Sequence, residues 1–173
     1  YYIVYRNRYS WVPEIERLSN KEILNMKIDD NFGLYGILTD SQRGYEYCTE
    51  LMVDYEIAFV QLRMKNRSVE EVSKVAQRLV SLVKGSKTKC IINDYPSVCK
   101  SVGADGVHIG QDDTSFSEVK NMVGNEIIIG LSTHSVEQTV DACKEEPSYI
   151  GIGPVYTTPT KVNPDPVIGL DGM

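Results

Sequence analysis

From Gly33 onward, short apolar runs alternate with amphipathic helical patterns, which is typical of parallel strands joined by crossover helices. Each apolar run has the length of one strand, and each stretch between two runs is long enough for one helix. The expected strands are residues 34–40, 59–65, 89–94, 106–110, 127–133 and 149–155. The pattern predicts an α/β fold, built either as a doubly wound sheet or as a (β/α) barrel.

Three of the intervening stretches begin with a helix start signal. Ser68 stands three residues before Glu71, the spacing of a capping box. The same spacing recurs in two later pairs, Ser115 with Glu118 and Ser135 with Gln138. After the first signal, apolar residues follow at helical spacing: Val72, Val75, Ala76, Leu79 and Val83.

The chain length constrains the architecture. A complete TIM barrel usually needs about 200 residues or more, and this chain has 173 residues. We therefore expect an incomplete TIM (β/α) barrel over residues 34–173, with about six of the eight β/α units present and two absent at the C-terminal end. Such a barrel would leave unpaired edges on its first and sixth strands.

Residues 1–33 differ in character and are interpreted as an N-terminal extension of uncertain packing. The run YYIVYR could form an edge strand, and S-N-K-E at 19–22 could start a short helix through Met26. Pro13 and the polar residues before Gly33 indicate a boundary. The simplest role for this segment is to cover one end of the barrel.

Composition narrows the class of protein. A net charge of -6 and a pI of about 5.0 argue against a surface that binds nucleic acid or an anionic membrane. The four cysteines form no CxxC pair, and no apolar stretch reaches the roughly 20 residues of a membrane span. We expect a soluble, cytoplasmic protein that acts on small molecules; a homo-oligomer is compatible with the sequence.

The run QLRMK carries the first indication of a binding site. If it is a strand, Gln61, Arg63 and Lys65 project to one face, and Leu62 and Met64 project to the other. Polar and cationic side chains on one face are costly in a sealed core, but they suit an open strand end that holds an anion. The alternative is an exposed edge strand of alternating polarity.

Carboxylates follow two later strands. Asn93 and Asp94 end one strand, and Asp112 and Asp113 come just after the next. The carboxyl ends of parallel strands carry the active sites of such folds, and Mg²⁺ prefers one or two carboxylates with phosphate oxygens and water. Asp94 with one of the later pair would satisfy that preference, although Asn93, Asp94 and the nearby Pro96 would equally suit a turn or a helix cap.

The last two strands carry small residues. Gly130 and Ser132 share one face, as do Gly151 and Gly153, which suggests either a closely approaching ligand or relief of crowding inside a barrel. A polar, phosphate-friendly loop follows the sixth strand. It contains Thr157, Thr158, Thr160 and Lys161.

Each of the two histidines, His108 and His134, is interpreted first as structural, although His134 at a strand end could titrate in a site. With two histidines and no HExxH or CxxC spacing, zinc chemistry is not favoured. The sequence contains neither G-x-G-x-x-G nor a P-loop, which argues against dinucleotide and nucleoside triphosphate sites.

Taken in order, five segments resemble the successive strand-end motifs of the thiamin phosphate synthase family: QLRMK, IINDY, GADGVHIGQDD, IIGLSTHS and YIGIGPVYTTPTK. The resemblance extends from LYGILTD to the GLDG at 169–172 and does not include residues 1–33. It implies a TIM barrel that joins hydroxymethylpyrimidine pyrophosphate to a thiazole phosphate with release of pyrophosphate, in thiamin biosynthesis. It also implies a dissociative mechanism that requires no protein nucleophile.

The resemblance implies a role for each matching residue. Asp94 and Asp113 would hold Mg²⁺, Ser132 would lie by the leaving pyrophosphate, and Asn93 would contact it. Charge on the pyrophosphate would be neutralised by three cations, Arg63, Lys65 and Lys161. Gln61, Arg63 and Lys65 would line the pyrimidine pyrophosphate pocket, while Thr158 and Thr160 would bind the thiazole phosphate.

Two alternatives remain open at this stage. A thiazole tautomerase of the same superfamily would use a histidine at the position of His134, but that family usually lacks the carboxylates and final lysine present here as Asp94, Asp113 and Lys161. A non-catalytic protein that binds thiazole phosphate would keep the pocket without turnover. Because the family continues with a seventh and an eighth strand, we expect the chain ending at Met173 to be poorly active by itself.

Overall fold

The computed structural model describes residues 3–5, 33–157 and 166–169. Contacts between Cα atoms divide the chain into two units, one of residues 32–129 and one of residues 1–31 with 130–173. Each unit is described by itself. None of the helices in the described ranges combines the length and the apolar character needed to cross a membrane.

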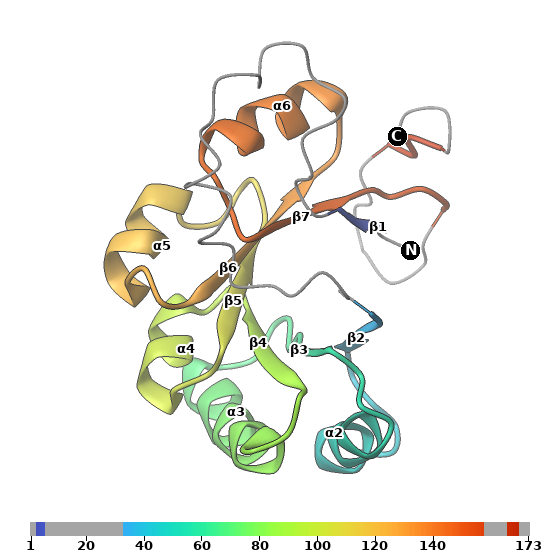
Figure 1. The fold of residues 1–173 in the computed structure, drawn as a ribbon, viewed down its shortest axis with the longest axis vertical. Helices are drawn as coiled ribbons and strands as arrows, with labels where there is room; N and C mark the ends of the chain where they lie inside the picture. The colour runs from blue at the N-terminus through green and yellow to red at the C-terminus, as the bar shows by residue number, and fades with distance from the viewer. Residues whose placement is uncertain (1–2, 6–32, 158–165, 170–173) are drawn as a thin grey trace. The chain divides into compact units, whose positions relative to one another are not determined.

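The unit of residues 32–129 is a parallel sheet with helices between its strands (Figure 1). Its strands pair in the order β2, β3, β4, β5, and all pairs are parallel. The strands are β2 (Tyr35–Leu38), β3 (Phe59–Leu62), β4 (Lys89–Asn93) and β5 (Gly106–Ile109). The helices are α2 (Tyr45–Asp54), α3 (Val69–Val83), α4 (Pro96–Val102) and α5 (Phe116–Val123).

The other unit contains the remaining strands. β6 (Ile128–Thr133) pairs in parallel with β7 (Tyr149–Ile152), and the helix α6 (Val136–Lys144) connects the two strands. The first two residues of β6 belong to the preceding unit. β1 (Ile3–Tyr5) runs antiparallel to β7. The prediction of an unpaired edge on the sixth barrel strand is therefore wrong, because β1 forms a ladder with β7. The alternation of strands and helices in the two units confirms the predicted α/β class.

The predicted helix starts are confirmed. Ser68 Oγ accepts a hydrogen bond from the Glu71 N–H at 3.2 Å, and a Glu71 carboxylate oxygen accepts one from the Ser68 N–H at 3.0 Å. Ser115 and Glu118 form the same capping box, and Ser135 accepts a hydrogen bond from the N–H of Gln138. The five apolar residues of α3 named above are all buried.

The end of the second predicted strand differs from the prediction. β3 stops at Leu62, although the Arg63 N–H still donates a hydrogen bond to the Leu38 carbonyl at 3.0 Å. The chain then turns, with Asn66 in the left-handed region at φ 58. The prediction that this strand extends through Lys65 is wrong, because Arg63 and Lys65 lie in the loop after it.

β3, β4 and β5 are buried on both faces, as is usual for central parallel strands. Val60 and Leu62 of β3, Ile91 and Ile92 of β4, and Val107 of β5 are all 0% exposed. The strands therefore form a rigid base for the loops that follow their carboxyl ends.

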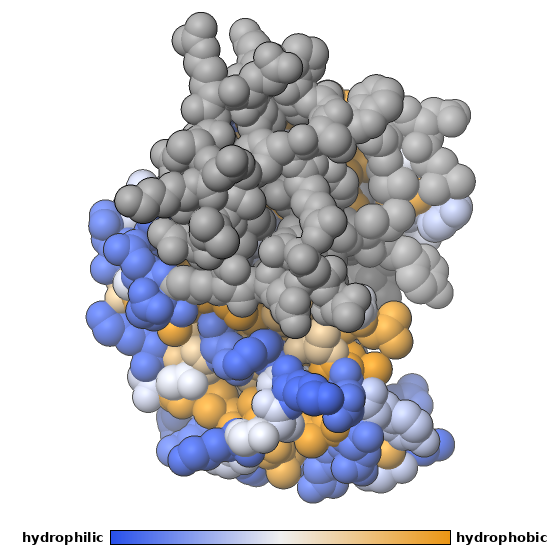
Figure 2. Space-filling view, viewed as in Figure 1, coloured by the Kyte–Doolittle hydropathy of each residue, from blue (hydrophilic) through white to orange (hydrophobic). Residues whose placement is uncertain are grey.

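β2 lies at the end of this parallel sheet and pairs only with β3 among the described residues. Large apolar side chains are exposed on β2, beside it, on α2 and just after α2: Leu34, Ile37, Tyr47, Leu51 and Tyr55. Figure 2 shows hydrophobic residues among hydrophilic ones in the lower part of the view, where Figure 1 places β2 and the first helices of this unit. The predicted open edge of the first barrel strand is thus present among the described residues.

Gly130 of β6 makes room for an aromatic ring. A Cβ atom at this position would overlap the ring of Tyr149, which is 1% exposed on the neighbouring strand. Of the two interpretations of this glycine, relief of crowding is therefore the correct one, and the space beside Gly130 is filled by protein.

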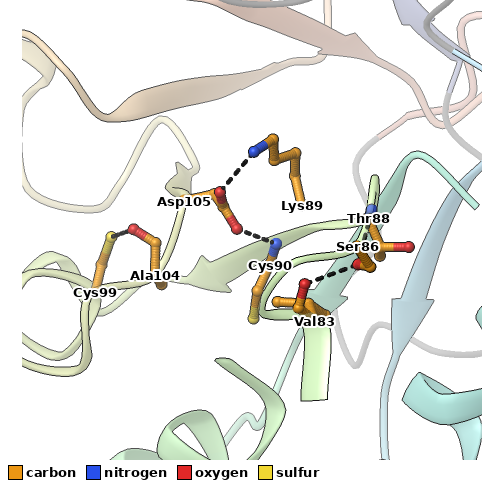
Figure 3. A network of polar contacts seen from close by, with 8 residues as sticks. All are labelled: Val83, Ser86, Thr88, Lys89, Cys90, Cys99, Ala104 and Asp105. Atoms are coloured by element: carbon orange, nitrogen blue, oxygen red, sulfur yellow. Dashed lines mark hydrogen bonds and ion pairs between the residues drawn. The ribbon is translucent and has the colours of Figure 1, made fainter. Parts of the chain in front are cut away.

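Asp105 connects the start of β4 to the turn before β5 (Figure 3). Its carboxylate accepts a hydrogen bond from the backbone N–H of Cys90 at 2.9 Å and forms an ion pair with Lys89 at 3.1 Å. The Cys90 side chain is 0% exposed, so an unpaired N–H here would be poorly hydrated. Asp105 thus satisfies a backbone group at the amino end of the sheet, opposite the end where strand-end loops gather.

This arrangement predicts the effect of removing the carboxylate. Asp105→Ala should lower the free energy of unfolding by about 1–3 kcal/mol, because the buried Cys90 N–H loses its acceptor. Asp54→Ala, which removes an exposed carboxylate at the end of α2, should change stability by less than about 0.5 kcal/mol. Urea denaturation measures both values, and equal losses in the two variants would contradict the assignment.

Candidate active site

One face of the sheet in residues 32–129 carries the polar strand residues. Gln61 of β3 is 2% exposed and Asn93 of β4 is 6% exposed. Asn93 pairs in register with His108 of β5, while Gln61 pairs with Ile91, two residues before Asn93. Because residues two apart on a strand share a face, and paired residues of neighbouring strands do too, all three polar side chains project to the same face.

Three charged side chains come together just beyond the carboxyl ends of these strands. Lys65 follows β3, Asp94 follows β4 and Asp113 follows β5. The Lys65 ammonium donates a hydrogen bond to an Asp94 carboxylate oxygen and forms an ion pair with it. The Asp113 carboxyl lies close enough to the Asp94 carboxyl to raise its pKa. The three residues are called the strand-end cluster below.

The backbone fixes Asp94 in the cluster. Its N–H donates a hydrogen bond to the His108 carbonyl at 2.9 Å, which extends the ladder of β4 and β5 by one residue. Its φ of 64 lies in the left-handed region, where aspartate and asparagine are the most readily tolerated residues after glycine. The Asp94 side chain is 16% exposed, so the carboxylate is largely withdrawn from water.

The structure distinguishes Asp113 from its neighbour Asp112. Both residues are exposed, but an oxygen of the Asp113 carboxylate accepts a hydrogen bond from the Gly110 N–H at 2.7 Å. A Cβ atom at Gly110 would lie 3.1 Å from that oxygen, so the small residue allows the close approach. The turn after β5 therefore directs Asp113, and not Asp112, toward Asp94.

Burial and charge control the protonation of these groups. Burial raises the pKa of Asp94 above its ordinary value, the Asp113 carboxyl raises it further, and Lys65 opposes both effects. Burial also lowers the pKa of His108 to about 4, so its imidazole is neutral near pH 7. At that pH the side chains of Gln61, Asn93 and His108 are neutral hydrogen-bonding groups. The charged side chains beside them are those of the strand-end cluster.

The two carboxyls suit a hard divalent cation. Asp94 and Asp113 are held side by side, and their mutual repulsion would fall if a cation lay between them. The described residues contain no group of three or more His, Cys, Asp or Glu side chains that could hold a metal ion. Two carboxylates with the remaining positions taken by water or phosphate is a usual arrangement for Mg²⁺, so the residues present fit that ion.

The remaining site candidates fall into three groups. Arg63 is half-buried in the loop after β3, next to the strand-end cluster in sequence. Ser132 is half-buried on β6, in the other unit. Three candidates lie outside the described residues: Thr158, Thr160 and Lys161.

His134 connects the ends of two strands within one unit. The ring Nδ1 atom of His134 lies 2.6 Å from the carbonyl oxygen of Gly153, just after β7. The backbone N–H of His134 donates a hydrogen bond to the side-chain oxygen of Gln138 at 2.7 Å. At the start of α6, the Gln138 side chain thus accepts a hydrogen bond from the backbone of His134, while the Gln138 backbone N–H donates one to the capping Ser135 hydroxyl. These contacts support the structural role expected for His134.

Sequence reasoning missed Tyr35. Its hydroxyl accepts a hydrogen bond from the Gln61 Nε2 atom at 2.8 Å. The available signal was the position of Tyr35 on the first strand, because a half-buried tyrosine usually needs a polar partner for its hydroxyl.

Comparisons with known proteins show which family the chain belongs to. Residues 34–173 match the family described as "Thiamine monophosphate synthase". Thiamine-phosphate synthase of Caldicellulosiruptor bescii is 34% identical over 149 residues, which are 84% of this chain and 68% of the relative. Thiamine-phosphate synthase of Clostridioides difficile is 36% identical over 131 residues, 73% of this chain and 62% of the relative.

A solved structure is similar over most of the chain. Thiamine phosphate pyrophosphorylase from Pyrococcus furiosus superposes with a TM-score of 0.72 at 27% identity, covering 86% of this chain and 69% of that one. The likeness supports the interpretation of the alternating strands and helices as part of a TIM-like (β/α) barrel. Strands β2 to β7 supply the six parallel strands expected for the incomplete barrel.

The raised pKa of Asp94 predicts a pH-dependent effect on stability. A carboxyl whose pKa is higher in the folded state stabilises the fold below its ordinary pKa, and this contribution is lost as the pH rises through the raised value. Asp94→Asn removes the buried charge and keeps a residue that tolerates positive φ. The variant should therefore be more resistant to urea than wild type at pH 7, and the difference should vanish near pH 3.

Asp112→Asn is the matched control, because it removes an exposed carboxylate three residues after β5 ends. Its stability relative to wild type should change little between pH 3 and pH 7. If Asp94→Asn were less stable than wild type at pH 7, the carboxylate would be stabilising the fold and its pKa would not be raised.

Proposed function

This chain belongs to the thiamine monophosphate synthase family, and we propose that it is a transferase that joins hydroxymethylpyrimidine pyrophosphate to thiazole phosphate. The pyrimidine methylene carbon would form a bond to the thiazole nitrogen and lose its bond to pyrophosphate. The products would be thiamin phosphate and pyrophosphate. The observation that carries the proposal is the strand-end cluster of Lys65, Asp94 and Asp113.

The cluster suits an anionic leaving group. Pyrophosphate departs only as its growing negative charge is balanced, and preorganised cations in a partly buried site do this effectively. Lys65 is already held by Asp94 at the strand ends. We propose that Arg63 and Lys161 supply further positive charge, and that Asn93 and Ser132 contact the pyrophosphate.

We assign Asp94 and Asp113 as the ligands of a Mg²⁺ ion. When bound, Mg²⁺ would neutralise charge on the pyrophosphate oxygens. The Gly110 N–H fixes Asp113, and the His108 carbonyl fixes the backbone of Asp94, so the two carboxylates are oriented before any ligand arrives. The Lys65 ammonium donates a hydrogen bond to Asp94, and we propose that it would also contact the pyrophosphate.

Substrate recognition is assigned to the neighbouring polar groups. Gln61, with Arg63 and Lys65, would bind the pyrimidine pyrophosphate. Thr158 and Thr160 would bind the thiazole phosphate, since hydroxyl groups close to a lysine suit a phosphate.

The reaction would need no nucleophile from the protein. The electron-rich aminopyrimidine can carry the transient positive charge left when pyrophosphate departs, and the thiazole nitrogen supplies the electron pair for the new bond. Two buried cysteines are poor nucleophiles because burial raises the pKa of Cys90 and of Cys99 to about 12. The chain's contribution would therefore be binding, orientation and charge neutralisation.

A thiazole tautomerase is the weaker alternative. The named relatives above are synthases, and the paired carboxyls of Asp94 and Asp113 have no evident use in an isomerisation without metal. The proposed function is tested by incubating the protein with both substrates and Mg²⁺ and measuring released pyrophosphate and thiamin phosphate. Isomerisation of thiazole phosphate without pyrophosphate release would favour the tautomerase.

Four variants test the site assignment. Asp94→Ala, Lys65→Ala and Asp113→Asn should each lower the rate of pyrophosphate release by about 100-fold or more, because each removes a charge that acts directly on the leaving group or its metal ion. Asp112→Asn should retain the wild-type rate. Circular dichroism should show intact folds, and wild-type rates in Asp94→Ala or Lys65→Ala would refute the assignment.

A further inference from the structure

Gln61 is a buried side-chain amide with an aromatic partner. It is 2% exposed on β3, and its Nε2 atom donates a hydrogen bond to the Tyr35 hydroxyl at 2.8 Å. A buried amide that lacks partners is costly, because it has lost its hydrogen bonds to water. Tyr35 supplies one partner from the neighbouring strand β2.

Tyr35 is itself held in place by its cross-strand neighbour. It pairs in register with Phe59, and the two rings stack with centroids 5.3 Å apart and an interplanar angle of 18°. Phe59 is 4% exposed, so this ring is fixed by the core. Since Phe59 and Gln61 are two residues apart on β3, the stacked pair and the amide lie on the same face.

The hydrogen bond restricts how Gln61 can meet a ligand. A glutamine amide has a broad torsion at its end and presents either NH₂ or C=O in a given direction. With Nε2 directed toward the Tyr35 hydroxyl, rotation of the amide is restrained. A restrained amide binds a ligand more tightly than a mobile one, because less conformational freedom is lost on binding.

We infer that Tyr35 is a positioning residue for the pyrimidine substrate, acting through the hydrogen bond from its hydroxyl to Gln61. The inference rests on the proposed function, which assigns Gln61 to the pyrimidine pyrophosphate pocket. In this role Tyr35 would orient Gln61 and would not act on the reacting atoms itself. Its ring lies on the face that carries Gln61, Asn93 and His108, with its hydroxyl at the buried amide.

The test removes one oxygen atom. Tyr35→Phe keeps the stack on Phe59 and deletes the hydrogen bond to Gln61. We expect KM for the pyrimidine pyrophosphate to rise about fivefold to tenfold, the usual effect of one lost hydrogen bond, while KM for the thiazole phosphate stays unchanged. Tyr55→Phe, at a tyrosine that is 77% exposed after α2, is the matched control and should behave as wild type.

A double-mutant cycle separates positioning from a general structural effect. Gln61→Met keeps the side-chain length and removes the amide. If Tyr35 acts through Gln61, Tyr35→Phe should have no further effect on KM in the Gln61→Met background. An equal rise in KM in both backgrounds, or equal rises for both substrates, would overturn the inference.

A second measurement is independent of catalysis. In ¹⁵N NMR spectra, the Gln61 side-chain NH₂ should exchange its protons with water more slowly than exposed glutamines do, and Tyr35→Phe should speed this exchange. Unchanged exchange in the variant would overturn the positioning role even if the enzyme is active. Absence of pyrophosphate release by wild type, with the NMR change present, would instead refute the proposed function and leave the Tyr35–Gln61 contact established.

Discussion

The parallel register of β3, β4 and β5 is the constraint on which the candidate site depends. Hydrogen bonds between these strands fix Gln61 beside Ile91 and Asn93 beside His108, so the polar side chains share one face. The same register makes the strands end at nearly the same level, and the loops after them bring Lys65, Asp94 and Asp113 together. A shift of one residue in any pair would turn a polar side chain into the aliphatic face and an aliphatic side chain into the site.

The cluster that this register creates works against the stability of the fold. Burial and the neighbouring Asp113 both disfavour the charged form of Asp94, and the Lys65 ammonium offsets only part of that effect. Asp94 also has a left-handed backbone, a conformation that costs energy for most residues other than glycine. The fold would be more stable without this buried carboxyl, so its presence is best explained by a ligand that needs it. A cation bound by both carboxyls would relieve the repulsion between them.

Much of the fold could be predicted from the sequence because the signals are local. The three helix caps depend on residues three positions apart, and the burial of α3 depends on helical periodicity alone. The approach of Asp94 to one of the pair Asp112 and Asp113 was also predictable, since all three follow strands of one parallel sheet, whereas the choice of Asp113 came from the family resemblance. By contrast, the end of β3 was misplaced because alternating polarity continues through Lys65 while the backbone has already begun to turn.

The features that the sequence could not reveal depend on contacts between distant residues. Gly130 and Gly110 look alike as strand glycines, yet one makes room for the Tyr149 ring and the other allows the Asp113 carboxylate to reach a backbone N–H. Tyr35 and Gln61 are 26 residues apart, and only the pairing of β2 with β3 brings the hydroxyl to the amide. The meaning of a small or an aromatic residue on a barrel strand is therefore decided by its cross-strand partner. Specificity in such a site is built by neighbouring strands as much as by the residues that touch the substrate.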